Sequence, residues 1–224
     1  LNIDGNAVAT RVATTVNFLN TRYYLERENV RINNNKIELI DAIVADEEGN
    51  TATVNGGLTH NRLKDFELDV FMKTNGETFL AMNTDETMNS TFYGRGMGRG
   101  FVRFSGPFSQ TNASITATTT EGTNVVTPVS SDATATKESF IVFEDETESN
   151  QEAEAPDIRG LNLEMNLELT QAANVELIFN RQWGDVIKGN GEGNLNILMT
   201  RNGDFEMRGN YTINEGKYLF TLRL

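Results

Sequence analysis

The stretch Leu161-Asn162-Leu163-Glu164-Met165-Asn166-Leu167-Glu168-Leu169 decides the fold. Apolar side chains occupy every second position, and Asn or Glu fills the positions between them. Successive side chains of a β-strand point to opposite faces, so this order puts the apolar groups on one face and the polar groups on the other. A helix would spread the same residues around its circumference. The stretch therefore predicts a half-buried strand.

The same period of two residues recurs along most of the chain. Residues 8–20 are rich in Thr and Val, which also favour extended structure. No segment keeps the 3.6-residue period of an amphipathic helix, so the chain is predicted to be all-β. The other alternating runs place apolar residues at Val30 and Ile32; Ile37 and Leu39; Phe66, Leu68, Val70 and Met72; Ala113, Ile115 and Ala117; Val175, Leu177 and Phe179; Leu195, Ile197 and Met199; Phe205, Met207, Tyr211 and Ile213.

Short turn signals separate these runs, which predicts an antiparallel meander. Two architectures need the same alternation. One is a β-sandwich of two facing sheets. The other is one long antiparallel sheet that curls on itself and leaves a groove lined by its apolar face. The predicted turns are Asn33–Asn35, Glu48–Asn50, Thr74–Gly76, Asn202–Asp204 and Asn214–Gly216.

Composition narrows the function classes. The 224 residues include 19 Lys and Arg against 32 Asp and Glu, a formal charge of −13, which argues against a nucleic-acid partner. The absence of Cys excludes disulfides and thiolate metal sites. No apolar run approaches the roughly 18 residues that a membrane helix needs. Because the sequence opens at Leu1 without a starting Met, we expect a fragment of a longer protein.

An acidic segment divides the chain. Residues 144–157 contain seven acidic residues and no basic one, which is typical of a solvated, disordered loop. We therefore expect residues 1–143 to form the N-terminal part of the sheet and residues 158–224 to form the C-terminal part of the same sheet.

Glycine occupies alternate positions in two places, residues 94–100 and residues 189–193. Strand-like sequence follows both, so a phosphate-binding loop before a helix is rejected. In a strand these glycines predict a bend or bulge, or a smooth wall for a long apolar ligand.

Catalytic groups do not assemble in the sequence. His60 is the single imidazole and no nucleophile elbow accompanies it, so a turn position is expected. Asp185 is interpreted as a turn residue, and Asp46 with its acidic neighbours as a solvated loop. We expect no enzyme activity, no metal and no cofactor.

The order of several blocks resembles the C-terminal domain of TamB, the translocation and assembly module protein, in its Bacteroidetes-type form. The blocks together span roughly residues 50–224. They are Gly56–His60, Asn89–Gly94, Thr120–Thr123, Phe140–Phe143, Trp183–Leu195 and Asn202–Phe220.

The resemblance implies a place among the AsmA-like lipid-transfer proteins of the Gram-negative envelope. Such proteins are anchored in the inner membrane by an N-terminal helix, which would lie outside this chain. They cross the periplasm as a curled β-sheet with an apolar groove, the β-taco, and meet an outer-membrane barrel of the TamA kind. The implied roles are phospholipid transfer between the two membranes and outer-membrane protein assembly, a part of protein secretion. We expect the family's usual final stretch beyond Phe220 to lie outside this chain.

We expect alternate apolar residues to line a groove for phospholipid acyl chains. The rival hypothesis is an adhesin-like or carbohydrate-binding β-sandwich, in which Trp183, Tyr23, Tyr24 and Tyr93 would stack on sugars. The expected groove residues are Leu161, Leu163, Met165, Leu167, Leu169, Leu195, Ile197, Met199, Phe205, Met207, Phe66, Leu68, Val70 and Met72.

Overall fold

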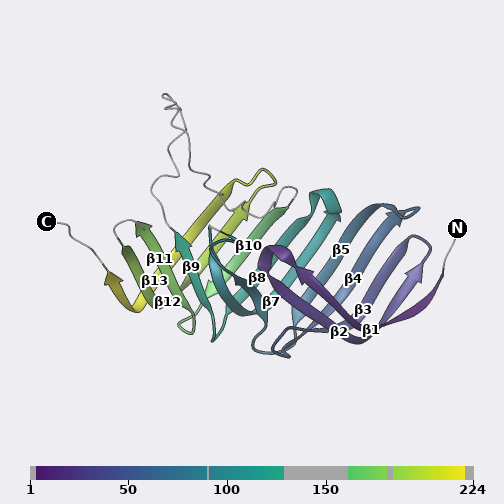
Figure 1. Cartoon of the computed structure of the whole chain (residues 1–224), viewed down its shortest axis with the longest axis horizontal. Helices are drawn as coiled ribbons and strands as arrows, with labels where there is room; N and C mark the ends of the chain where they lie inside the picture. The colour runs from purple at the N-terminus through teal and green to yellow at the C-terminus, as the bar shows by residue number, and fades with distance from the viewer. Residues whose placement is uncertain (1–3, 90, 129–160, 181–183, 220–224) are drawn as a thin grey trace, which may run out of the picture.

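The computed structural model describes residues 4–89, 91–128, 161–180 and 184–219. Within these residues thirteen strands form one sheet, which runs from β1 at the N-terminal end to β13 at the other (Figure 1). Two 3-10 turns, η1 (Asn17–Leu19) and η2 (Phe108–Gln110), accompany them. The strands are β1 (Asp4–Val16), β2 (Thr21–Asn33), β3 (Lys36–Ala45), β4 (Thr51–Asn61), β5 (Lys64–Thr74), β6 (Leu80–Thr84), β7 (Tyr93–Pro107), β8 (Asn112–Thr119), β9 (Asn124–Pro128), β10 (Asn162–Leu169), β11 (Asn174–Asn180), β12 (Asp185–Met199) and β13 (Phe205–Leu219).

The prediction of an all-β curled sheet is confirmed, and the described strands form no second sheet facing it. Strands β1 to β5 follow one another as an antiparallel meander. Two of its turns, at Asn33–Asn35 and Glu48–Asn50, lie where the sequence predicts them, and the Asn202–Asp204 turn joins β12 to β13. The turns that join β1 to β2 and β4 to β5 were not predicted, and the first of them falls in residues 8–20, which were expected to be strand. One predicted turn is wrong. Residues Asn214–Gly216 lie inside β13, where a shift of register opposite Asn190 and Gly191 marks a β-bulge.

Two long strands organise the rest of the sheet. Strand β7 pairs with β5 and β6 along one edge and with β8 and β9 along the other. Strand β12 pairs with β10 and β11 along one edge and with β13 along the other. Each long strand thus continues past a break in its neighbours, and these breaks lie at residues 75–79, 120–123 and 170–173.

Both glycine rows lie in these long strands, which supports the predicted bend. Gly94 of β7 has φ +118, and a Cβ there would lie 2.2 Å from the carbonyl oxygen of Asn124 in β9. A Cβ at Gly191 of β12 would lie 2.0 Å from the carbonyl oxygen of Thr212 in β13. Only glycine lets the backbones approach this closely, so these rows permit the tight curvature of the sheet.

The sheet is mixed, where the sequence predicted antiparallel pairing throughout. Strand β10 pairs parallel with β8, and β11 pairs parallel with β9. Parallel neighbours need a long crossover between them, and residues 129–161 between β9 and β10 supply one. The predicted acidic loop at 144–157 lies outside the described residues, so the boundaries at 143 and 158 stay predictions.

Candidate functional site

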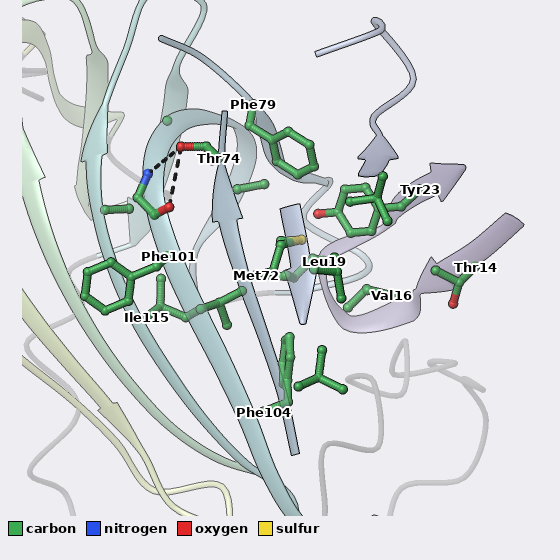
Figure 2. A pocket seen from close by; sticks show the side chains of 18 of the residues that line it. Thr14, Val16, Leu19, Tyr23, Met72, Thr74, Phe79, Phe101, Phe104 and Ile115 are labelled. Carbon is green, nitrogen blue, oxygen red and sulfur yellow. Dashed lines mark hydrogen bonds between the residues drawn. The ribbon is translucent and has the colours of Figure 1, made fainter. Parts of the chain in front are cut away.

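An apolar cavity of about 520 Å³ lies against the inner face of the N-terminal half of the sheet. Strands β3, β4, β5, β7 and β8 supply one wall of it, and the β1–β2 hairpin supplies the other. Figure 2 shows Val16, Leu19 and Tyr23 of the hairpin converging on Met72 and Phe104 of the sheet. Aliphatic and aromatic groups make up most of the lining, which also includes three Thr residues and Arg99. A mostly apolar lining is what an apolar ligand needs.

A second cavity of about 330 Å³ continues along the C-terminal half. It is lined by β10, β11, β12 and β13 together with parts of β7, β8 and β9. The two cavities are adjacent and form one trough on the concave face of the sheet. They share the lining residues Leu19, Ala81, Gly98, Ile115 and Ala117.

The tip of the β1–β2 hairpin stands at the junction of the two cavities. Leu19 of η1 lines both of them. Its neighbour Phe18 makes an edge-to-face contact with Phe92, with ring centroids 6.2 Å apart. Phe92 in turn lies 6.0 Å from the ring of Phe205 in β13. The trough is therefore divided at one point by the chain's own hairpin and stays open on both sides of it.

Side chains hold this tip against β6. Among the described residues, no backbone ladder joins the tip to β6. The Asn20 amide nitrogen donates to the Asn83 carbonyl oxygen at 2.7 Å, and the Tyr23 hydroxyl donates to the Leu80 carbonyl oxygen at 3.2 Å. The Tyr23 ring also stacks on Phe79 with centroids 5.2 Å apart. Burial raises the pKa of Tyr23, and the nearby Asp46 carboxylate raises it further, so the phenol stays protonated as a donor.

Asp46 is a buried carboxylate, which corrects its interpretation as a solvated loop residue. It is only 3% exposed. Its oxygens accept from the Glu48 and Asn50 backbone N–H groups, from the Asn50 side chain, and from the Leu80 N–H at 2.7 Å. Burial alone would raise the pKa of Asp46, but the bonds from Asn50, Leu80 and Glu48 outweigh it and the pKa is lowered. Asp46 thus ties the β3–β4 loop to the start of β6.

Most of the predicted groove residues lie on the inner face. Leu68, Val70 and Met72 line the first cavity, and Met165, Leu167, Leu169, Leu195, Ile197, Phe205 and Met207 line the second.

The four remaining predicted residues line neither cavity. Leu163 and Met199 are buried in the cluster that also contains Met165 and Ile197, and Leu161 packs on that cluster. Phe66 lies apart from the trough, stacked on Phe108 at 5.7 Å.

The other candidates do not form a site. His60 accepts from the Leu63 N–H at 3.2 Å in the β4–β5 turn. Tyr23 is buried, Tyr24 lies beneath the Arg22 guanidinium at 5.4 Å, and Trp183 falls outside the described residues. In the described ranges no cluster of His, Cys, Asp or Glu has the arrangement to hold a metal ion. Those ranges also contain no helix with the length and apolar character to span a membrane.

The hairpin tip is the part of the site that sequence reasoning missed. Phe18 and Leu19 are adjacent apolar residues between Asn17 and Asn20, so they interrupt the period of two within a stretch predicted as strand. That interruption was the available signal for an apolar turn that projects from the sheet. Phe79 and Phe92 lie outside the alternating runs and carried no such signal.

Comparison with known proteins gives one match. The model of the TamB C-terminal domain matches residues 40–223, well over half of the chain. No curated protein and no solved structure gives a significant match. The domain indicates an envelope role, in outer-membrane protein assembly or lipid transport, and domains of this family are not known as enzymes. The family model specifies no bacterial group, so the Bacteroidetes type stays a prediction. The chain belongs to the TamB family, and its residues 40–223 are a TamB C-terminal domain.

Proposed function

We propose that the trough is a segment of a periplasmic conduit that holds phospholipid acyl chains on their way between the inner and outer membranes. The observation that carries the proposal is the pair of adjoining apolar cavities on one face of a single sheet. Moving an acyl chain out of an apolar environment costs about 0.8 kcal/mol per CH₂ group. A continuous apolar lining removes that cost, and no catalytic group or cofactor is needed.

The polar outer face fits this role. The positions between the lining residues of β10 carry Asn and Glu, and Asn196 of β12 donates to Asn166 of β10 at 2.9 Å on that face. The net charge of −13 keeps an open sheet soluble in an aqueous compartment. We propose the periplasm as that compartment, with the inner-membrane anchor in a part of the protein outside this chain.

A free sheet edge favours a barrel as partner. Strand β13 pairs with β12 along its length, and the described residues place no strand against its other edge. An open edge can add a strand from another protein by backbone hydrogen bonding. We therefore propose that an outer-membrane barrel of the TamA kind docks here, which would also serve outer-membrane protein assembly.

The assignment of the lining is tested by two variants of β10, each of which places a charged residue on a different face of the strand. Leu167 of β10 lines the second cavity opposite Leu195 of β12, whereas Asn166 faces outward. We expect Leu167→Asp to block phospholipid transfer between donor and acceptor vesicles. Asn166→Asp adds the same charge one residue away and keeps an acceptor for Asn196, so transfer should continue. Equal transfer by the two variants would disprove the lining assignment.

The barrel proposal has its own test. Because the sequence contains no Cys, a single cysteine at Glu206 in β13 can be joined to cysteines in the edge strands of a TamA-type barrel. We expect crosslinks from this position and none from the control Asn166→Cys on the outer face of β10. Crosslinks of equal yield from both positions, or none from Glu206→Cys, would remove the proposed docking edge.

A further inference from the structure

Polar side chains are few in the second cavity, and most of them are hydrogen-bonded within the protein. Among the described residues its lining contains no charged side chain and five hydroxyl groups. Two of the hydroxyls belong to β8. Thr118 donates to the Glu168 carboxylate at 2.8 Å, and Thr119 accepts from the Thr170 N–H at 3.0 Å. Neither of these hydroxyls is free to bind a ligand.

Two more hydroxyls of this lining are bonded to the backbone. Thr123 accepts from the Met97 N–H at 3.1 Å and donates to the Met97 carbonyl oxygen at 2.7 Å. The Tyr211 hydroxyl donates to the Gly189 carbonyl oxygen at 3.3 Å. Four of the five hydroxyls therefore have partners in the protein.

Thr127 of β9 carries the fifth hydroxyl, which has no hydrogen-bond partner among the described residues. The residue is only 8% exposed. It pairs with Leu177 of β11, which lines the same cavity. The hydroxyls of Thr21 and Thr84 also lack partners, but they are enclosed, and neither residue lines a cavity. In the described part of the second cavity, Thr127 is thus the hydroxyl left for a ligand.

The chemistry of a phospholipid supplies the group that this hydroxyl lacks. A threonine hydroxyl has one proton to donate. Each acyl chain of a phospholipid ends in an ester, whose carbonyl oxygen accepts a hydrogen bond and cannot donate one. Placing that carbonyl in an apolar trough without a donor is unfavourable, as is leaving the hydroxyl unpaired. A bond between the two satisfies both groups.

The surroundings of Thr127 favour a neutral acceptor. No Lys, Arg or His of the described residues lines the second cavity. A carboxylate or a phosphate would therefore be buried there without a counter-ion, which is far less favourable than burial of a neutral group. An ester carbonyl carries no charge and meets this condition.

We propose that the Thr127 hydroxyl donates a hydrogen bond to an ester carbonyl of the bound lipid, so that the second cavity selects ester-linked acyl chains over ether-linked chains. The inference rests on the proposed function and names the chemical class of its ligand. No such selection is expected in the first cavity, where the hydroxyls of Thr74 and Tyr23 are hydrogen-bonded and Thr14 and Thr15 are exposed.

The test offers the 224-residue chain a choice between two lipids. The probe is a vesicle made of equal amounts of dioleoyl phosphatidylcholine and its diether analogue, which has the same chains without the two carbonyl groups. The vesicles are removed, and native mass spectrometry measures the ester-to-ether ratio of the lipid that stays on the protein. One hydrogen bond corresponds to about a fivefold preference. We expect the ester to be enriched about two- to fivefold, because lipid in the first cavity dilutes the selection.

Three variants assign the preference to the hydroxyl. Thr127→Val replaces the hydroxyl with a methyl group of similar shape, so lipid should still bind, with the ratio of the vesicles. Thr127→Ser keeps a hydroxyl and should keep the enrichment. The control Thr116→Val makes the same change at an exposed residue of β8 that lines neither cavity, and it should match the wild type.

The outcomes separate the inference from the proposed function. Lipid bound to the wild type in the ratio of the vesicles would overturn the selection and leave the proposed function standing. Full enrichment in Thr127→Val would overturn the assignment to this hydroxyl. A folded wild-type chain that takes up neither lipid would overturn the proposed function and the inference with it.

Discussion

Replacing Asp46 with alanine removes the acceptor that fixes β6 to the β3–β4 loop. Four hydrogen bonds end on this carboxylate, and bonds to charged groups contribute about 1.5–3 kcal/mol each. The loop donors recover part of this from water. The Leu80 N–H does not, because Leu80 is 1% exposed. We expect Asp46→Ala to lower the free energy of unfolding by about 3–5 kcal/mol, a large share of the roughly 5–15 kcal/mol of a typical domain.

Urea unfolding followed by circular dichroism measures this loss. The midpoint should fall by about 2 M with an unchanged slope of about 2 kcal/mol/M. Glu47→Ala is the matched control, since it removes the same charge from an exposed neighbour in the same loop. If the two variants unfold within about 0.5 kcal/mol of each other, a difference typical of unremarkable surface substitutions, the assigned role of Asp46 is wrong.

The same carboxylate predicts a pH dependence. Hydrogen bonds lower the folded-state pKa of Asp46 despite its burial. Its contribution to stability is therefore complete above the unfolded-state pKa of about 3.9 and is lost as the pH falls through the folded-state pKa. In Asp46→Asn this acid-dependent loss should be missing from urea midpoints measured between neutral and acidic pH. A variant that follows the wild-type pH curve in full would contradict the assignment.

Three further predictions concern the sheet, each read from the urea midpoint. Gly94→Ala should destabilise by about 1–3 kcal/mol because of backbone strain and the Asn124 carbonyl, whereas Gly76→Ala, with open space around its Cβ, should be neutral; equal effects would contradict the close approach of β7 and β9. Ile197→Ala, in the buried cluster of the second cavity, should cost about 2–5 kcal/mol, and a smaller loss would mean that the cluster is loosely packed. Arg103→Ala breaks an exposed ion pair and should change stability by no more than about 1 kcal/mol; a larger loss would refute its surface role.

Much of the fold is legible in the sequence because alternation and turn chemistry are local. The period of two in residues 161–169 predicts both the strand β10 and its inward face. Asn214–Gly216 failed as a turn because β13 continues along β12, where the same residues form a bulge. Local turn chemistry fits a bulge as well as a turn, and the pairing partner decides between them.

The two parallel strand pairs could have been predicted from the sequence but were not. Thr120, Asn124 and Val125 recur as Thr170, Asn174 and Val175. The structure sets these segments side by side at that constant offset of 50 residues: Asn124 pairs with Asn174 and Val125 with Val175. An internal repeat of this kind predicts stacked, parallel copies. The prediction relied on turn signals, and the short turn within each copy does not reveal the repeat.

The contact of the hairpin tip with β6 and the Asp46 network could not be read from the sequence. Asp46 and Leu80 are 34 residues apart, and Tyr23 and Leu80 are 57 apart. Such contacts follow from the curl of the whole sheet. Asp46 is followed in the sequence by two acidic residues and a glycine. An Asp with such neighbours gives the same sequence pattern whether its side chain is buried or solvated.

The central claim is that the trough holds acyl chains, and native mass spectrometry of the purified chain tests it most directly. We expect the wild type and Asn166→Asp to carry phospholipid released on activation in the gas phase, and Leu167→Asp to carry none. A folded wild-type chain that is free of lipid, and that takes up none after incubation with phospholipid vesicles, would contradict the claim.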